Sequence, residues 1–295
     1  MSAPLSRYSL ARLSSSASAA HLLASAAQSS AALPTAVCSA RGARLSSALR
    51  ELSARGGAAW PSVSGESEAL LGALARGALA PAAASALSAL QLALLDLGAL
   101  AGAVRVEPVD VAAVARGAAA DVSELCVDKL GVAPRVDVLA GDAPLPAVLG
   151  ARAYIAFALR ELLKNAAAAT VERFGALRVD DDAPPLTLLT SAAGGRVRVA
   201  LADAGGGLPG RAGRVDEFQW FSSTAASEKT PTYTYSRDFV APFRGAGTGL
   251  ARAALVARWH GGSLALLSQP GHGVSAALEL EVSGKGTAAH ALKQR

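Results

Sequence analysis

The spacing of apolar residues predicts a long helix near the middle of the chain. Over residues 154–174 apolar side chains recur mostly at three- and four-residue intervals, and Gly175 follows directly. They are Ile155, Phe157, Leu159, Leu162, Leu163, Val171 and Phe174. The opposing stripe carries Glu161, Lys164 and Asn165. We therefore expect a helix that buries one face and presents a polar stripe on the other.

Alternation of apolar and polar residues then predicts two β-hairpins. The expected strands are Leu186–Thr190, Val197–Leu201, Ser263–Ser268 and Val274–Val282. Gly194-Gly195 forms the first turn and Gly271-His272-Gly273 the second. Between the hairpins, Ala251–Trp259 has a helical pattern. The order helix, hairpin, helix, hairpin indicates an α/β sandwich with a mixed sheet.

The first 130 residues are predicted to be mainly helical. Ser64 is expected to cap a helix that runs to Leu74, because serine oxygens accept hydrogen bonds from first-turn amides. Further helices are expected at Ala82–Leu97 and at Val109–Leu130, the latter ended by Gly131. A short strand at Val136–Leu139 and a loop at Gly141–Pro146 follow. The fold class is therefore α+β, with a helical bundle preceding the sandwich.

Four segments are expected along the chain. Residues 1–50 contain no Asp or Glu but several Arg and many Ser, a composition typical of an organelle transit peptide. We assign residues 1–45 to such a disordered leader, the alternative being an Ala/Ser-rich tail without a targeting role. Residues 46–132 would form the helical domain and residues 133–283 the sandwich. Residues 284–295 are expected to be a disordered tail.

Composition excludes several classes of protein. The 295 residues allow two domains, and the net charge of +5 comes without any Lys/Arg block interleaved with aromatics. We therefore expect no nucleic-acid partner. The longest apolar run, Ala80–Ala103, is interrupted by proline, glutamine and aspartate, so no membrane span is expected. Cys38 and Cys126 lack metal-ligand spacing, so neither a zinc site nor a disulfide framework is expected.

The polar stripe of the central helix is the first candidate for chemistry. Glu161 and Asn165 are four residues apart, which places them on one helix face. A carboxylate there can accept a proton from an attacking hydroxyl, and an amide oxygen is a suitable Mg²⁺ ligand. Alone, the pattern also fits a solvated face with a Glu161–Lys164 ion pair.

Two glycine-rich segments follow at the ends of expected elements. Asp203 precedes Gly205-Gly206-Gly207 at a strand end, where a carboxylate can accept a hydrogen bond from an adenine amino group. Residues 245–250 open the helix at 251–259, and helix N-termini bind phosphate. No Walker motif or full dinucleotide fingerprint is present. The polar segment between them, residues 210–244, is long enough to be a lid.

Together these motifs resemble the nucleotide-binding boxes of the histidine-kinase-like ATPases. Within that superfamily the chain is similar to the mitochondrial kinases that phosphorylate 2-oxoacid dehydrogenases, the pyruvate and branched-chain dehydrogenase kinases. The resemblance covers about residues 107–282 and rests on Glu161–Glu172, Asp203-x-Gly-Gly-Gly, Ser223-Thr224 and Gly245-x-Gly-x-Gly-Leu250. Residues 125–136, 261–264 and 268–273 resemble the branched-chain kinase most closely.

The resemblance implies a role for each motif. Glu161 would be the catalytic base and Asn165 the Mg²⁺ ligand, with ATP and Mg²⁺ as cofactors. Residues implied to contact the nucleotide are Glu161, Lys164, Asn165, Ala168, Asp203, Gly205, Gly207, Ser223, Thr224, Gly245, Ala246, Gly247, Thr248, Gly249 and Leu250. The substrate would be a serine of the dehydrogenase E1 α subunit, which phosphorylation inhibits. The lipoyl-bearing E2 core would be the scaffold, the location the mitochondrial matrix, and a homodimer is allowed.

The chain departs from the family at several positions. The family's arginine late in the first box is Ala168 here, and aromatic residues of the second glycine loop are replaced by Ala246 and Thr248. The region before residue 105 is short for the family's four-helix bundle. A nucleotide-binding regulator without catalysis, a pseudokinase, is therefore an alternative. Glu161 favours the kinase over this regulator, which needs no base. An unrelated ATP-hydrolysing member of the superfamily is a third interpretation, which the narrow motifs disfavour.

Overall fold

The computed structural model describes residues 43–51, 60–74, 81–100, 104–141, 144–216, 218–220 and 247–283. Its contacts divide the chain into two compact units. The first comprises residues 1–105 with 219–221, and the second comprises residues 106–218 with 222–295. The mixture of helices and strands confirms the predicted α+β class. The expected leader up to residue 42 and the expected tail from residue 284 lie outside the described residues.

The first unit is helical where it is described. It contains a helical segment at residues 43–51, α3 (Trp60–Leu74) and α4 (Pro81–Leu100). Leu45, Leu74 and Leu87 are at most 1% exposed, and Gln91 Nε2 donates a hydrogen bond to Ser67 Oγ at 3.0 Å. The predicted start at Ser64 is wrong. The helix begins one turn earlier, at Trp60-Pro61, and proline is well tolerated in a first turn because its missing N–H has no helical partner there.

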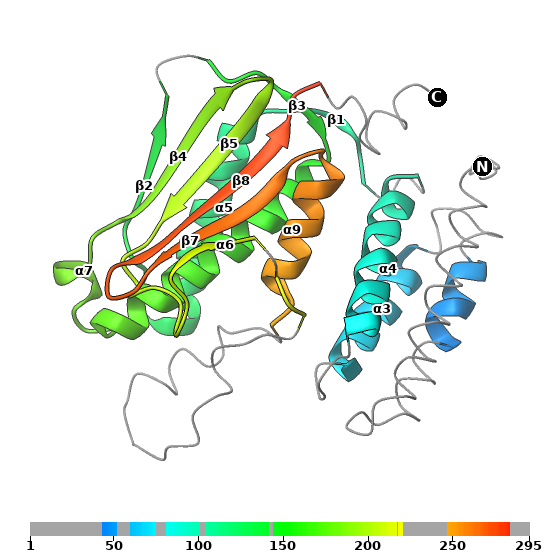
Figure 1. Cartoon of the computed structure of the whole chain (residues 1–295), viewed down its shortest axis with the longest axis horizontal. Coiled ribbons are helices and arrows are strands. Elements are labelled where there is room, and N and C mark those ends of the chain that lie inside the picture. The colour runs from blue at the N-terminus through cyan, green and yellow to red at the C-terminus, as the bar shows by residue number, and fades with distance from the viewer. Residues whose placement is uncertain are drawn as a thin grey trace. The chain divides into compact units, whose positions relative to one another are not determined.

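The second unit is built on a six-stranded sheet (Figure 1). The strand order is β2 (Val136–Ala140), β4 (Leu186–Ala193), β5 (Arg196–Ala202), β8 (Gly273–Glu281), β7 (Ser263–Gln269) and β6 (Gly213–Val215). Only β2 and β4 pair in parallel, so the predicted mixed sheet is confirmed. Both expected hairpins form, and each strand ends within three residues of its predicted limits.

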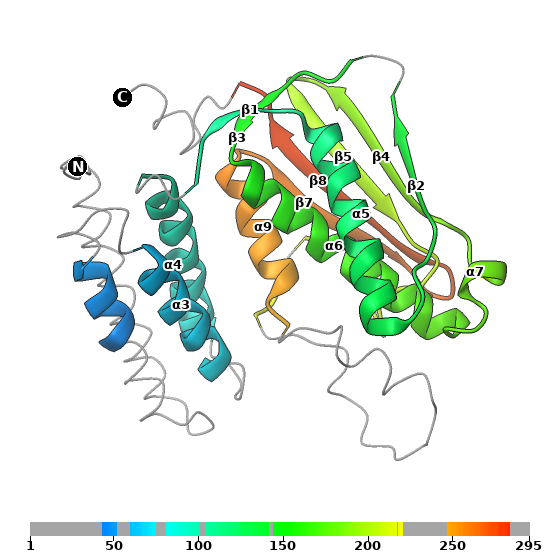
Figure 2. The same cartoon turned by 180° about the vertical axis from the view of Figure 1, so that it is seen from behind.

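Three helices cover one face of this sheet, as seen from behind in Figure 2. They are α5 (Val111–Leu130), α6 (Arg152–Phe174) and α9 (Gly249–Trp259). The covered face is apolar because alternate strand residues point towards the helices: Leu188, Val199 and Leu278 are at most 1% exposed. The core of the unit lies between this face and α6, whose Ile155, Leu159 and Leu163 are at most 1% exposed.

Helix α5 belongs to the sheet-bearing unit, although we assigned it to the helical domain ending at 132. It packs along α6, and the contacts put the division of units at residues 105 and 106. Its ends follow the sequence closely: Asp110 accepts a hydrogen bond from Ala113 N, and Gly131 is left-handed with φ 71°. The predicted inclusion of Val109 is wrong, because Val109 ends strand β1 (Glu107–Val109).

His260 joins the end of α9 to the start of α6. Its Nδ1 donates to Val256 O at 2.8 Å, and its Nε2 accepts from Ala151 N at 3.1 Å. Ala151 provides no side-chain cap for α6, so the imidazole satisfies a backbone group at that helix start. Burial lowers the pKa of His260 to about 4, which keeps the ring neutral and preserves this pair of bonds.

Some elements were not predicted. β1 (Glu107–Val109) and β3 (Val148–Gly150) form a separate antiparallel pair, and α7 (Val179–Asp182) is one short turn. β6 falls inside the segment expected to be a lid, so residues 213–215 belong to the sheet instead. The rest of that segment, from residue 221, lies outside the described residues. Across the described ranges, no helix is long and apolar enough to cross a membrane.

Of the two cysteines, the structure describes Cys126. Cys126 is a free, buried thiol on α5, and burial raises its pKa to about 11. Its environment is therefore that of a small core residue, without a reactive thiolate at neutral pH. Cys38 lies outside the described residues.

Candidate nucleotide site

One row of residues on α6 carries the candidate site. Phe157, Glu161, Asn165, Ala169 and Arg173 follow one another at intervals of four, so each lies about one turn beyond the last. Asn165 is exposed, whereas Glu161 is half-buried. Glu161 and Ala169 are eight residues apart, which corresponds to about 12 Å along the helix axis. The other parts of the site meet α6 along this row.

Glu161 meets the N-terminus of α9. Its Oε1 accepts from Lys164 Nζ at 2.9 Å, and the two side chains are only 20% and 23% exposed. Its Oε2 faces Gly249, the first residue of α9, where any Cβ atom would collide with that oxygen. Thr248 makes no side-chain capping bond, so first-turn amides of α9 are left available next to the carboxylate.

The Asp203 loop meets α6 two turns further on. A Cβ atom on Gly205 would collide with Ala169, so this loop lies directly on the helix. Asp203 Oδ1 accepts from Gly205 N at 2.8 Å and from Val274 N at 3.2 Å. Neither donor bonds Oδ2, for which no hydrogen bond occurs among the described residues. Oδ2 therefore retains its capacity to accept a hydrogen bond from a ligand.

The ionisation of Asp203 reflects the same surroundings. Burial raises the pKa of this carboxyl group above its usual value, and the bonds from Gly205 and Val274 oppose that rise. A partly desolvated carboxylate with one oxygen already fixed is well suited to accept one hydrogen bond from an amino group on an aromatic ring. The arrangement can therefore hold an elongated ligand along α6, with an amine-bearing end at Asp203 and an anionic end near Gly249.

The structure accounts for two glycines by protein packing. At Gly205, a Cβ atom would collide with Ala169 of α6. Gly207 has φ 87°, and a Cβ atom there would lie 2.8 Å from Gln269 O. Both were predicted as nucleotide contacts, but their lack of a side chain is required by α6 and by the β7–β8 hairpin. Ala168, also predicted as a contact, is 7% exposed and presents no polar atom.

The second glycine loop is described only in its last four residues. Gly247, Thr248, Gly249 and Leu250 are half-buried at the start of α9, and Gly247 is left-handed with φ 72°. The remaining predicted contacts of this part of the chain lie outside the described residues: Ser223, Thr224, Gly245 and Ala246. The geometry thus places Glu161, Lys164 and Asn165 on α6, the start of α9 beside Glu161, and the Asp203 loop two turns away beside Ala169.

The side chains of the site fit a Mg²⁺ ion that takes most of its ligands from the nucleotide phosphates and water. In the described parts of the chain, no three His, Cys, Asp or Glu residues gather as a metal site. Mg²⁺ commonly keeps waters and substrate phosphates as ligands and takes one or two groups from the protein. Asn165, exposed between the two ends of the site, has the amide oxygen to serve as such a ligand.

Two arginines near this row were not predicted. Arg252, on the first turns of α9, lies with its guanidinium 4.6 Å from the centre of the Phe157 ring. Arg173 donates to three backbone carbonyls beside the Asp203 loop. Neither interaction can be recognised in the sequence, because any residue supplies a backbone carbonyl and a ring face has no fixed spacing from its cation. For Arg173, its position on the four-residue row of α6 was the only available signal, whereas Arg252 lies on α9 and had none.

No family model matches the chain. Curated proteins do: over 183 residues, 61% of the chain, it is 32% identical to the mitochondrial pyruvate dehydrogenase (acetyl-transferring) kinase of Arabidopsis thaliana. The corresponding kinase of Schizosaccharomyces pombe is 28% identical over 168 residues, and a probable one of Caenorhabditis elegans is 34% identical over 128 residues.

The matched regions are 47%, 38% and 28% of those three proteins. The chain therefore spans less than half the length of these curated relatives. The comparisons confirm the resemblance to the mitochondrial pyruvate dehydrogenase kinases that the motifs indicated.

Proposed function

We propose that this relative of the mitochondrial pyruvate dehydrogenase kinases is an ATP-dependent protein-serine kinase of the mitochondrial matrix. Its substrate would be a serine of the E1 α subunit of a 2-oxoacid dehydrogenase, pyruvate or branched-chain, which phosphorylation would inhibit. The observation that carries the proposal is the row on α6 that presents Glu161 beside the α9 N-terminus and Ala169 beside the Asp203 loop.

Each side chain has a task in the proposed reaction. Asp203 Oδ2 accepts from the adenine amino group, and the α9 amides bind phosphate oxygens. Asn165 would hold Mg²⁺, which would supply positive charge beside the phosphates. The serine oxygen attacks the γ-phosphorus, ADP leaves, and Glu161 accepts the hydroxyl proton. Lys164 fixes the carboxylate through Oε1, which leaves Oε2 on the side of Gly249.

The partners follow from the relatives' names and from the resemblance. Their names state action on pyruvate dehydrogenase, so this complex is the first candidate. The E1 α subunit would be the acceptor and the lipoyl-bearing E2 core the scaffold. A branched-chain dehydrogenase remains the second candidate, favoured by residues 261–264 and 268–273.

A catalytically weak nucleotide-binding regulator is the second candidate function. It is favoured by Ala168, which removes the arginine that the family carries in its first box. It is also favoured by the short match to the relatives. Such a regulator needs Asn165 and Asp203 but has no use for a base at position 161, so Glu161 favours the kinase.

One experiment separates these functions. The purified full chain is incubated with Mg-ATP and a dehydrogenase E1 α subunit, phosphoserine is mapped by mass spectrometry, and ADP binding is measured in parallel by calorimetry. Phosphoserine that depends on the chain supports the kinase. ADP binding without transfer to pyruvate or branched-chain E1 α supports the regulator. Absence of both would refute each proposal.

A further inference from the structure

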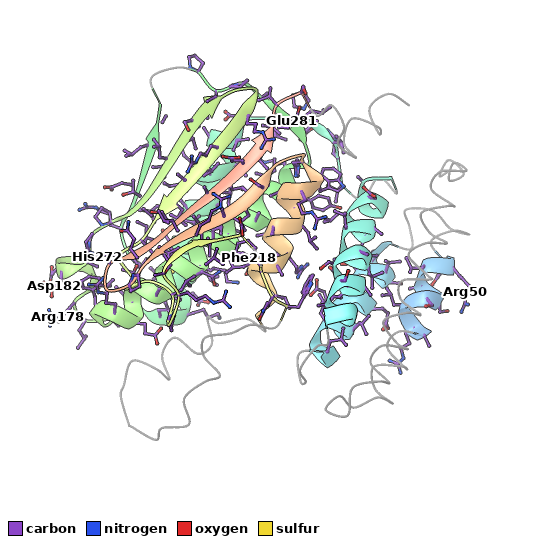
Figure 3. The ribbon with its side chains drawn as sticks, in the orientation of Figure 1. Arg50, Arg178, Asp182, Phe218, His272 and Glu281 are labelled. Carbon is purple, nitrogen blue, oxygen red and sulfur yellow. The ribbon has the colours of Figure 1, made fainter. Side chains whose placement is uncertain are left out.

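Arg173 is an exposed side chain with an unusual set of partners. Its Nη1 donates to Ala204 O and to His272 O, each at 2.6 Å, and its Nη2 donates to Gly271 O at 3.0 Å. Ala204 directly follows Asp203, while the other two belong to the turn between β7 and β8. Figure 3 shows His272 at that turn, at the tip of the hairpin. One guanidinium therefore joins α6, the Asp203 loop and the hairpin turn.

Backbone hydrogen bonds already hold the Asp203 loop against the turn between β7 and β8. Gly206 N donates to His272 O at 3.2 Å, and Gly271 N donates to Gly206 O at 2.8 Å. The three carbonyls that face Arg173 bring their negative ends together, which is unfavourable without a positive donor between them. A planar guanidinium with several fixed N–H groups suits this convergence better than an ammonium does.

The held loop is the one that orients Asp203. Asp203 N donates to Val274 O at 2.9 Å, just after the turn, and Asp203 Oδ1 accepts from Gly205 N and Val274 N. Both amides that fix this carboxylate are thus within two residues of a carbonyl bound by Arg173. Movement of Ala204 or His272 would shift the amides that fix Oδ1, and the free oxygen Oδ2 would move with them.

We infer that Arg173 is a positioning residue for adenine recognition, which acts by holding the Asp203 loop against the β7–β8 turn. This inference rests on the proposed function, because it takes adenine as the group that Asp203 reads. Arg173 itself contacts no ligand in this scheme. The helix end adds to the effect, since a cation in the last turn of α6 is also favoured by the helix dipole.

The test is a double-mutant cycle on ADP binding, measured by calorimetry with the full chain and Mg²⁺. The variants are Arg173→Ala, Asp203→Ala and the double variant, with Arg173→Lys as the conservative replacement. Arg178→Ala is the matched control, because Arg178 is an exposed arginine of the same region that binds only Asp182 in the described structure (Figure 3). Thermal unfolding confirms that each variant is folded.

We expect Arg173→Ala to weaken ADP binding about tenfold and Arg178→Ala to leave it unchanged. Arg173→Lys should recover part of the affinity, since lysine supplies the charge without the planar geometry. The double variant should bind no more weakly than Asp203→Ala alone, because Arg173 acts through that residue.

Additive losses would overturn the inference, as would an Arg173→Ala affinity equal to the wild type. If the wild-type chain binds no ADP, the proposed function fails. If the wild type binds ADP but Arg173→Ala does so equally well, only this inference fails. The two failures are therefore distinguishable in one titration series.

Discussion

Gly249 lies against the carboxylate of Glu161, so closely that a Cβ atom at position 249 would collide with Oε2. The two residues are 88 positions apart in the chain (249 − 161) and belong to different helices. With any other first residue, α9 could begin here only if the Glu161 side chain moved aside. This contact links the amides proposed to bind phosphate to the group proposed to accept the proton.

Substitution of Gly249 tests that relationship. Gly249→Ala should move either Glu161 or the first turn of α9, and we expect phosphoserine formation to fall by at least about tenfold, since small displacements of a base are costly. Gly117→Ala is the matched control, because Gly117 lies on an exposed part of α5 with open space around it. The control should keep full activity and gain about 1 kcal/mol of stability.

Removal of the proposed base should separate binding from catalysis. Glu161→Gln keeps the shape of the side chain, so ADP affinity should stay within about threefold, whereas phosphoryl transfer should be lost. Calorimetry and phosphoserine mapping measure the two quantities. Glu124→Gln, at an exposed position of α5, should change neither. Equal transfer by the Glu161→Gln protein would remove Glu161 from the mechanism.

Substitution of Asp203 should weaken binding of the adenine base and leave the phosphate contacts at α9 unchanged. Asp203→Ala removes the acceptor proposed for the adenine amino group and should weaken ADP binding about tenfold or more. Asp203→Asn keeps an oxygen for Gly205 N and Val274 N but replaces the other oxygen with a donor, so it should weaken binding nearly as much. An unchanged calorimetric affinity in both variants would contradict the assignment.

The buried His260 should make the protein less stable in weak acid. Its folded pKa of about 4 is below the usual 6.5, so below pH 6.5 the unfolded chain binds a proton that the folded chain does not. Stability is complete above pH 6.5 and falls as the pH drops towards 4. Between pH 6.5 and 5 we expect a loss of about 2 kcal/mol from this group.

Urea unfolding at several pH values measures that loss. His260→Gln removes the titration while an amide can still bond Val256 O and Ala151 N. The variant should be less stable at pH 7.5 but should lose less stability on acidification over the same interval. Parallel curves for the two proteins would show that His260 does not cause the acid sensitivity.

The sequence predicted the parts of the fold that follow a period. α6 and both hairpins have clear apolar spacing, and Gly131 and Gly175 mark helix ends. The missed elements are short. β6 is only Gly213-Arg214-Val215 and gains its place by pairing with β7, which no local pattern reveals. The unit boundary was misplaced because α5 shows an apolar face but not which helix covers it.

The candidate site was predictable to the extent that it consists of polar residues at helix spacing and strand ends. Glu161, Asn165 and Asp203 were found in this way. The contacts that shape the site were not found, because they join side chains to backbone atoms of distant segments. Arg173 at three carbonyls and Gly249 at a carboxylate are both of this kind.

The row on α6 also limits how this protein can change in length. Arg173 comes twelve positions after Glu161, and a helix turns by about 100° with each residue. Insertion or deletion of a single residue between them would rotate Arg173, which holds the Asp203 loop, by more than a quarter-turn relative to Glu161. Between positions 161 and 173, functional variants of this chain should therefore tolerate substitutions far more readily than insertions or deletions.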